Sequence, residues 1–208
     1  MRINRRVARR VTMAHPPRSR VLPMASILVV YSTIHGQTGR IAQRIGRVLE
    51  AAGHAATVRS VGEPGVGAAI IEHAAVVVGG SIQRGRHSRA LENFVRAHRE
   101  QLASRPNAFF SVSLSAAGTA KQVAQARRCV DRFEARTGWH PAAVALFAGA
   151  LPYSKYNPVL RFVMRLIVRM AHGDTDTSRD YEYTDWSAVE RFASEFASRV
   201  PALSAAAD

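Results

Sequence analysis

Apolar and polar positions alternate in blocks along most of the chain. Five short stretches are almost uninterruptedly apolar or rich in β-branched residues, at residues 26–33, 55–61, 74–81, 107–116 and 142–151. Runs of this length and composition are typical of strands that are buried on both faces of a sheet. We therefore predict five strands, each followed by small or polar residues.

Between the runs, apolar residues recur at helical spacing. The first predicted helix ends at Gly53 and buries Ile41, Ile45, Val48, Leu49 and Ala52; the second is capped by Ser88 and buries Leu91, Phe94, Val95, His98 and Leu102. The third spans 119–136 and buries Val123, Ala126, Val130 and Phe133. The last begins near Thr184 or Asp185 and buries Val189, Phe192, Ala193, Phe196 and Val200. Residues 63–73 are weakly helical. Strands that alternate with helices predict an α/β fold with a parallel sheet covered on both faces.

One interval does not fit this alternation. About 34 residues, 151–184, separate the fifth strand from the last helix, whereas connections in such folds are usually short. We treat residues 152–184 as a helical insertion. In a parallel α/β sheet, ligands bind at the carboxyl ends of the strands, so the residues of functional interest should follow the strands.

Composition and charge limit the function. The 208 residues, 47% of them hydrophobic, suit one domain with a sizeable core. The net charge is +14, but residues 1–23 hold seven arginines and no acidic residue. Without this segment the chain has 22 basic and 15 acidic side chains, a net charge of +7. We expect residues 1–23 to be a disordered tail or a mis-called start, and residues 201–208 a disordered end.

The single Cys129 excludes an intramolecular disulfide and a multi-cysteine metal site, and we expect it to be a small buried side chain.

The loop after the first strand carries the first candidate chemistry. Ser32, Thr33 and Thr38, with Gly36, stand between a buried strand and a helix start. Backbone N–H groups at a helix N-terminus and nearby hydroxyls suit a phosphate. The loop has neither the lysine of a nucleoside-triphosphate loop nor a GxGxxG pattern. A terminal phosphomonoester fits what remains, and an ordinary capped helix start is the alternative.

A wider set of motifs resembles a known family. The stretches "YSTIHGQT", "GGSIQRGRHS", "FFSVSLSA", "AGALPYSKYNPVLRFVMRLIVRM" and "GDTDTSRDYEYTDW" together resemble the flavodoxin-like, quinone-dependent protoporphyrinogen IX dehydrogenases of bacteria, from Met24 to about residue 200. The resemblance implies a flavodoxin-like doubly wound sheet of order 2-1-3-4-5 within residues 24–200. It also implies one FMN per chain.

The same resemblance implies a set of FMN-binding residues: Ser32, Thr33, Ile34, His35, Gly36, Gln37 and Thr38 at the phosphate, and Ser81, Ile82, Gln83, Arg84, Gly85, Ser113, Leu114, Ser115, Ala116, Ala117 and Gly118 at the isoalloxazine ring. Arg84 and Arg86 would favour an anionic reduced flavin or meet the propionates of a porphyrin. His87 and His35 are candidate proton acceptors because histidine titrates near neutrality, with water as the alternative. No metal ligand is implied.

The insertion contains "VLRFVMRLIVRMAHG", Val159 to Gly173. A helix over 158–172 would be about 22 Å long, too short to cross about 30 Å of hydrocarbon. Arg161, Arg165 and Arg169 would form one stripe on it, with Phe162 and Leu166 in the apolar arc. Either that arc packs on the domain and forms a homodimer, or the helix lies on an anionic membrane surface.

These observations, with the resemblance, lead to one functional hypothesis. The chain is expected to oxidise protoporphyrinogen IX with FMN and to reduce menaquinone or ubiquinone in haem biosynthesis, as a cytoplasmic protein peripheral to the inner face of the cell membrane. A flavodoxin-type electron carrier or a general flavin quinone reductase is the alternative. We expect no nucleic-acid partner, because no aromatic platform or recognition motif accompanies the arginine-rich tail.

Overall fold

The computed structural model describes residues 24–151 and 181–201. It contains a five-stranded sheet of order β2-β1-β3-β4-β5 in which every neighbouring pair is parallel. The strands are β1 Ser26–Ser32, β2 Ala55–Ser60, β3 Ala75–Ser81, β4 Asn107–Ser113 and β5 Val144–Ala148. The predicted fold class and strand order are therefore confirmed.

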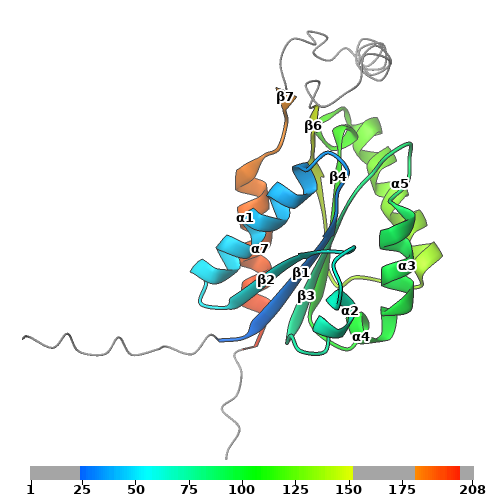
Figure 1. Cartoon of the computed structure of the whole chain (residues 1–208). Helices are drawn as coiled ribbons and strands as arrows, with labels where there is room; N and C mark the ends of the chain where they lie inside the picture. Colours follow the sequence, from blue (N-terminus) through cyan, green and yellow to red (C-terminus); the bar gives the residue numbers. More distant parts are fainter. Residues whose placement is uncertain (1–23, 152–180, 202–208) are drawn as a thin grey trace, which may run out of the picture.

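Helices cover both faces of the sheet (Figure 1). α1, Gln37–Ala51, and α7, Trp186–Arg199, pack on one face, where Ile41, Ile45, Val189 and Ala193 are fully buried. α3, Arg89–Ala97, and α5, Ala120–Thr137, pack on the other face with two shorter helices, α2, Val66–Ala69, and α4, Arg99–Ala103. Two apolar layers thus enclose the sheet, as the uninterrupted strands required.

Several boundaries differ from those expected. The helix after Ser88 is divided, because His98 leaves the helical conformation (φ −118°, ψ 16°) between α3 and α4. The fourth strand ends at Ser113, and residues Leu114–Ala117 form a 3-10 turn. The 63–73 stretch contains only the single turn of α2. The shortening of the fourth strand occurs at the end of an element, where sequence patterns are least precise, whereas the break at His98 lies inside the predicted helix.

The fifth predicted strand is two separate strands. β5 ends at Ala148, and after Gly149 the chain forms β6, Ala150–Leu151, which pairs antiparallel with β7, Tyr181–Glu182. Residues 152–180, most of the expected insertion, and the five residues predicted to contact a membrane lie outside the described residues. The ribbon of β6 and β7 nevertheless brings the two ends of that segment side by side.

Candidate flavin-binding site

The loops that follow β1, β3, β4 and β5 meet at one edge of the sheet. In the register of the strands, Ser32 lies opposite Gly80, and Ser81 lies opposite Val112. A cleft of about 420 Å³ opens between these loops. It is lined by Thr33, Ile34, His35, Gln37, Thr38, Ser81, Ile82, Gln83, Arg84, Val112, Ser113, Leu114, Gly149 and Ala150. We call it the ring cleft.

The first loop presents an uncapped helix start to this cleft. Gly36 is the N-cap of α1 in the left-handed region (φ 97°), and no side chain caps the helix. The Gly36 N–H donates to Thr33 Oγ1 over 3.0 Å, which closes the loop and leaves the first-turn N–H groups of α1 without a side-chain acceptor. Such groups carry partial positive charge and favour an anion. Thr38, 1% exposed, adds a hydroxyl at the same place.

The loop after β3 is a tight hairpin. The Gln83 N–H donates to the Arg86 carbonyl over 2.8 Å, and the Arg86 N–H donates back to the Gln83 carbonyl over 3.1 Å. Arg84 and Gly85, the two turn residues, both have positive φ values, 48° and 77°. Two consecutive residues of this kind form the turn that connects strands most tightly, at a conformational cost for Arg84 because it has a Cβ.

Contacts from α5 hold this hairpin in place. The Gly85 carbonyl accepts a hydrogen bond from the Cys129 thiol over 3.3 Å and another from the Arg132 guanidinium over 3.2 Å. The single cysteine is buried, as expected, but it also has this polar contact, which the sequence did not suggest. The hairpin beside the ring cleft is therefore fixed by side chains from a different element.

A buried carboxylate fixes the next residue of the loop. Glu92, on the first turn of α3, accepts from Arg86 over 3.3 Å and from Arg136 over 3.1 Å. Its side chain is 6% exposed, whereas each arginine is 42% exposed. A charge buried this deeply requires such partners, so the three residues link the hairpin to α3 and α5.

The residues present fit a flavin mononucleotide. The loop at Gly36 offers N–H groups and hydroxyls to a terminal phosphate. The cleft between the β3 and β4 loops has a mixed lining, in which Ser81, Ser113 and Gly149 are small and Ile82 and Leu114 are apolar, and a flat ring can approach it. One polar atom there lacks a partner: the hydroxyl of Ser113 is buried without a hydrogen bond among the described residues. A polar ring edge would satisfy it. The described residues contain no cluster of three or more potential metal ligands.

His87 lies beneath the hairpin rather than at its surface. It is 1% exposed, and its ring lies against Phe109 and Phe133, with centroids 5.3 and 4.9 Å away. Its Nε2 is 3.0 Å from Ser111 Oγ. Burial and, to a smaller extent, the nearby charge of Arg136 together lower the pKa of His87 to about 4. An imidazole whose charged form is disfavoured by burial is a weak base, which argues against His87 as the proton acceptor.

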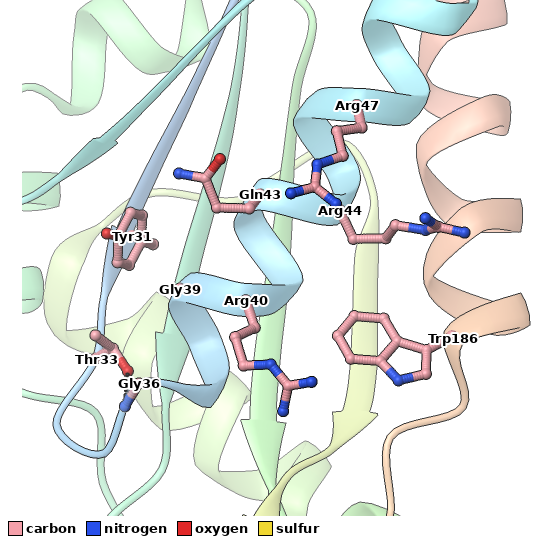
Figure 2. Close-up of a pocket in the computed structure, with 9 residues that line it drawn as sticks. All are labelled: Tyr31, Thr33, Gly36, Gly39, Arg40, Gln43, Arg44, Arg47 and Trp186. Atoms are coloured by element: carbon pink, nitrogen blue, oxygen red, sulfur yellow. Dashed lines mark hydrogen bonds between the residues drawn. The ribbon is translucent and has the colours of Figure 1, made fainter.

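A second, larger hollow of about 730 Å³ lies over α1 (Figure 2). Tyr31 and Gln43 lie on one side of the helix, and Arg44 and Trp186 lie on the other. Its arginines serve the fold: Arg40 pairs with Glu182 over 2.7 Å and lies 5.6 Å from the Trp186 ring, and Arg44 pairs with Glu190. The loops after β3 and β4 do not contribute to this hollow, so it is not the place for a flavin ring.

Most of the predicted cofactor residues line the ring cleft, and some do not. Ser32 is buried and hydrogen-bonded to Ser88 over 2.9 Å. Gly85 faces α5 through its carbonyl. Ser115, Ala116, Ala117 and Gly118 are not among the residues that line the cleft. The sequence did not lead us to predict Gly149 and Ala150 as lining residues. Their small size and their position directly after the fifth strand were the signal that could have indicated them.

A doubly wound sheet of this order, with an uncapped helix start after β1 that could hold an anion and a cleft between the β3 and β4 loops, defines a flavodoxin-type protein. The chain belongs to the flavodoxin domain family, whose model matches residues 28–178. It is 36% identical over 173 residues to "Protoporphyrinogen IX dehydrogenase [quinone]" of Escherichia coli K12, covering 82% of this chain and 93% of the relative. The protein of the same name from Leishmania major is 36% identical over 170 residues, with 82% and 74% covered. These relatives are oxidoreductases, and we assign the chain to that class of enzyme.

Solved structures agree with the fold. Flavodoxin 2 from Bacillus cereus has a TM-score of 0.53 at 17% identity, covering 84% of this chain and 99% of its own. A short-chain flavodoxin associated with a bacterial microcompartment has a TM-score of 0.54 at 15% identity, covering 85% and 99%. At this identity the likeness concerns the fold. Among the helices that the structure describes, none is long and apolar enough to cross a membrane.

Proposed function

We propose that this chain uses one FMN to oxidise protoporphyrinogen IX to protoporphyrin IX, and that it passes the electrons to a quinone, menaquinone or ubiquinone, in haem biosynthesis. The observation that carries the proposal is the 36% identity across 82% of the chain to enzymes of that name. The ring cleft supports it, because the loop after β1 lines it together with the loops after β3 and β4.

The roles of the residues follow from their places. The first turn of α1, with Thr33 and Thr38, would hold the phosphate, and the hairpin at Arg84 with the loop at Ser113 would flank the ring. FMN, when bound, supplies an acceptor for hydride equivalents and a donor of electrons to quinones. The exposed guanidinium of Arg84 at the cleft favours an anionic form of the reduced ring.

The protons released by the substrate need an acceptor near the rim. His87 is excluded by its burial and low pKa. We propose water at the open rim, with His35, which lines the cleft, as the nearest imidazole. The chain then contributes orientation and electrostatics, and solvent takes the protons.

We further propose that residues 152–180 contact an anionic membrane surface on the inner face of the cell membrane. The support is positional: Gly149 and Ala150 line the ring cleft, and Ala150 pairs with Glu182. Both ends of the segment therefore start at the rim of the cleft. A bilayer held there would bring a lipid-dissolved quinone close to the flavin.

The membrane proposal has a direct test. Changing Arg161, Arg165 and Arg169 together to Glu should weaken sedimentation with anionic liposomes and leave FMN bound. A matched control changes three exposed arginines elsewhere, Arg47, Arg128 and Arg199, to Glu, so that the net charge is the same. Equal partitioning of both variants and the unmodified protein would refute the membrane contact.

The enzymatic proposal is tested by anaerobic mixing. Protoporphyrinogen IX should bleach the yellow flavin of the FMN-loaded protein, and a quinone should restore the colour. Thr38→Val, a variant of nearly the same shape, should bind FMN about tenfold more weakly because a phosphate contact is lost. A flavin that stays oxidised with the porphyrinogen, yet exchanges electrons with other redox proteins, would identify an electron carrier instead.

A further inference from the structure

A small hollow lies beside the ring cleft and shares part of its lining. It has a volume of about 200 Å³ and is lined by Ile34, Ser81, Gln83, Arg86, His87, Ser88 and Arg89. Three of these residues, Ile34, Ser81 and Gln83, also line the ring cleft. The two spaces are therefore neighbours on either side of the β3 loop, and a ligand lying over the flavin could extend into the smaller one.

The charges around this hollow are mainly positive. Arg86 and Arg89 line it, and no acidic side chain does. Glu92 is close by, but its two oxygens are taken by Arg86 and Arg136 and its side chain is 6% exposed. Two arginines and the N-cap of α3 thus line a space that no carboxylate of the described residues lines.

Hydrogen-bonding capacity in the hollow is unused. Arg89 is exposed and has no ion-pair partner among the described residues. His87, in the wall, has a buried Nδ1 without a hydrogen-bond partner in the described parts of the chain.

Ile34 adds an exposed apolar side chain to the boundary between the two spaces. Ile34 is 58% exposed and lines both. In the described regions, Ile71 is the only other large hydrophobic residue that is at least as exposed. An exposed aliphatic side chain between a ring cleft and a basic hollow suits a ligand with an apolar body and an anionic arm.

We propose that this hollow is a subsite for a carboxylate arm of the substrate, with Arg89 and Arg86 as its donors and Ile34 beneath the apolar body. The inference rests on the proposed function, because a porphyrinogen with propionate side chains has both features. A space of about 200 Å³ accepts a short carboxylate arm and excludes a macrocycle. Arginine suits the role because its planar fork pairs with both carboxylate oxygens.

The test compares an acid substrate with its ester. Arg89→Gln should raise the KM for protoporphyrinogen IX about tenfold, which is the loss of one charge-assisted hydrogen bond. It should leave the KM for the dimethyl ester unchanged, because the ester offers no anionic oxygen. Arg128→Gln, an equally exposed arginine on α5 that lines none of the three hollows, is the matched control.

A second measurement does not depend on turnover. Protoporphyrin IX and its dimethyl ester are titrated into the FMN-loaded protein and followed by porphyrin fluorescence. The acid should bind more tightly than the ester, and Arg89→Gln should abolish the difference without changing the FMN content. Added phosphate should compete only weakly if the hollow recognises an arm joined to an apolar body.

The outcomes separate the two proposals. If the protein oxidises neither the porphyrinogen nor its ester but still binds the acid more tightly than the ester, the proposed function is refuted and the subsite is not. An equal effect of Arg89→Gln on acid and ester, or no effect on either, would refute the subsite and leave the function standing. Full competition by millimolar phosphate would show a site for free anions and overturn the assignment.

Discussion

The buried imidazole of His87 makes the stability of this protein depend on pH. The charged form is excluded by burial among aromatic rings, so the pKa falls from 6.5 to about 4. In the unfolded chain the same side chain takes up a proton near its ordinary pKa. Between these two values the unfolded state binds more protons than the native state, and native stability must fall as the pH falls.

The size of the effect follows from the shift. One pKa unit corresponds to 1.36 kcal/mol, so the fall to about 4 amounts to roughly 3 kcal/mol across the whole window. At pH 5 only part of the range between the unfolded and native pKa values has been crossed. A change from near pH 7.5 to pH 5 should therefore lower the free energy of unfolding by about 2 kcal/mol. This loss is a large fraction of the stability of a small domain.

The assay is urea unfolding of the FMN-loaded protein at both pH values. His87→Gln and His87→Phe do not titrate and differ in packing, so each should have its own stability at neutral pH. Both should lose about 2 kcal/mol less than the unmodified protein on acidification. Variants that lose as much stability as the unmodified protein would refute the reasoning, since the pH dependence would then come from other groups.

Two more predictions concern the contacts that hold the β3 hairpin. Glu92→Gln leaves two arginines without their shared anion. We expect it to lower the free energy of unfolding, measured by urea titration, by about 2 kcal/mol, because the partial exposure of the arginines limits the loss. An unchanged urea midpoint would contradict the role of the ion pairs. Cys129→Ala removes the thiol donor to the Gly85 carbonyl and should weaken FMN binding a few-fold, equivalent to about 1 kcal/mol, as measured by fluorescence of released flavin. Cys129→Ser keeps a donor and should retain most of the affinity, so equal weakening in both variants would argue for packing rather than the hydrogen bond.

The sheet was predictable because burial on both faces leaves a simple trace in sequence. Apart from Ser32, the runs at 26–33 and 74–81 have apolar residues or glycine at the positions that the sheet buries, and helical spacing marked Ile41 and Ile45. The strand order came from the family resemblance and not from the pattern, since periodicity does not specify neighbours. Ends of elements, such as the break at His98 and the early end of β5, depend on local backbone geometry that weak patterns do not encode.

The site was predictable in outline only. The phosphate loop was visible because glycine and hydroxyl residues follow a strand directly. The cleft's Gly149 and Ala150 were missed, because their role depends on the pairing of β6 with β7 across a long interval of sequence. His87 shows the same limit: it was read as a titratable loop residue, and its burial against Phe109 and Phe133 depends on β4 and α5.

The sequence by itself determined which segments form strands and helices, where an anion could bind, and which family the chain resembles, because these depend on neighbours within one element or on motifs. Only the tertiary structure decided that Cys129 and Arg132 hold the Gly85 carbonyl, that Glu92 joins two arginines, and that a basic hollow lies beside the ring cleft. These contacts join residues that are distant in the chain. Their distances, burial and charges exist only once the helices have packed on the sheet.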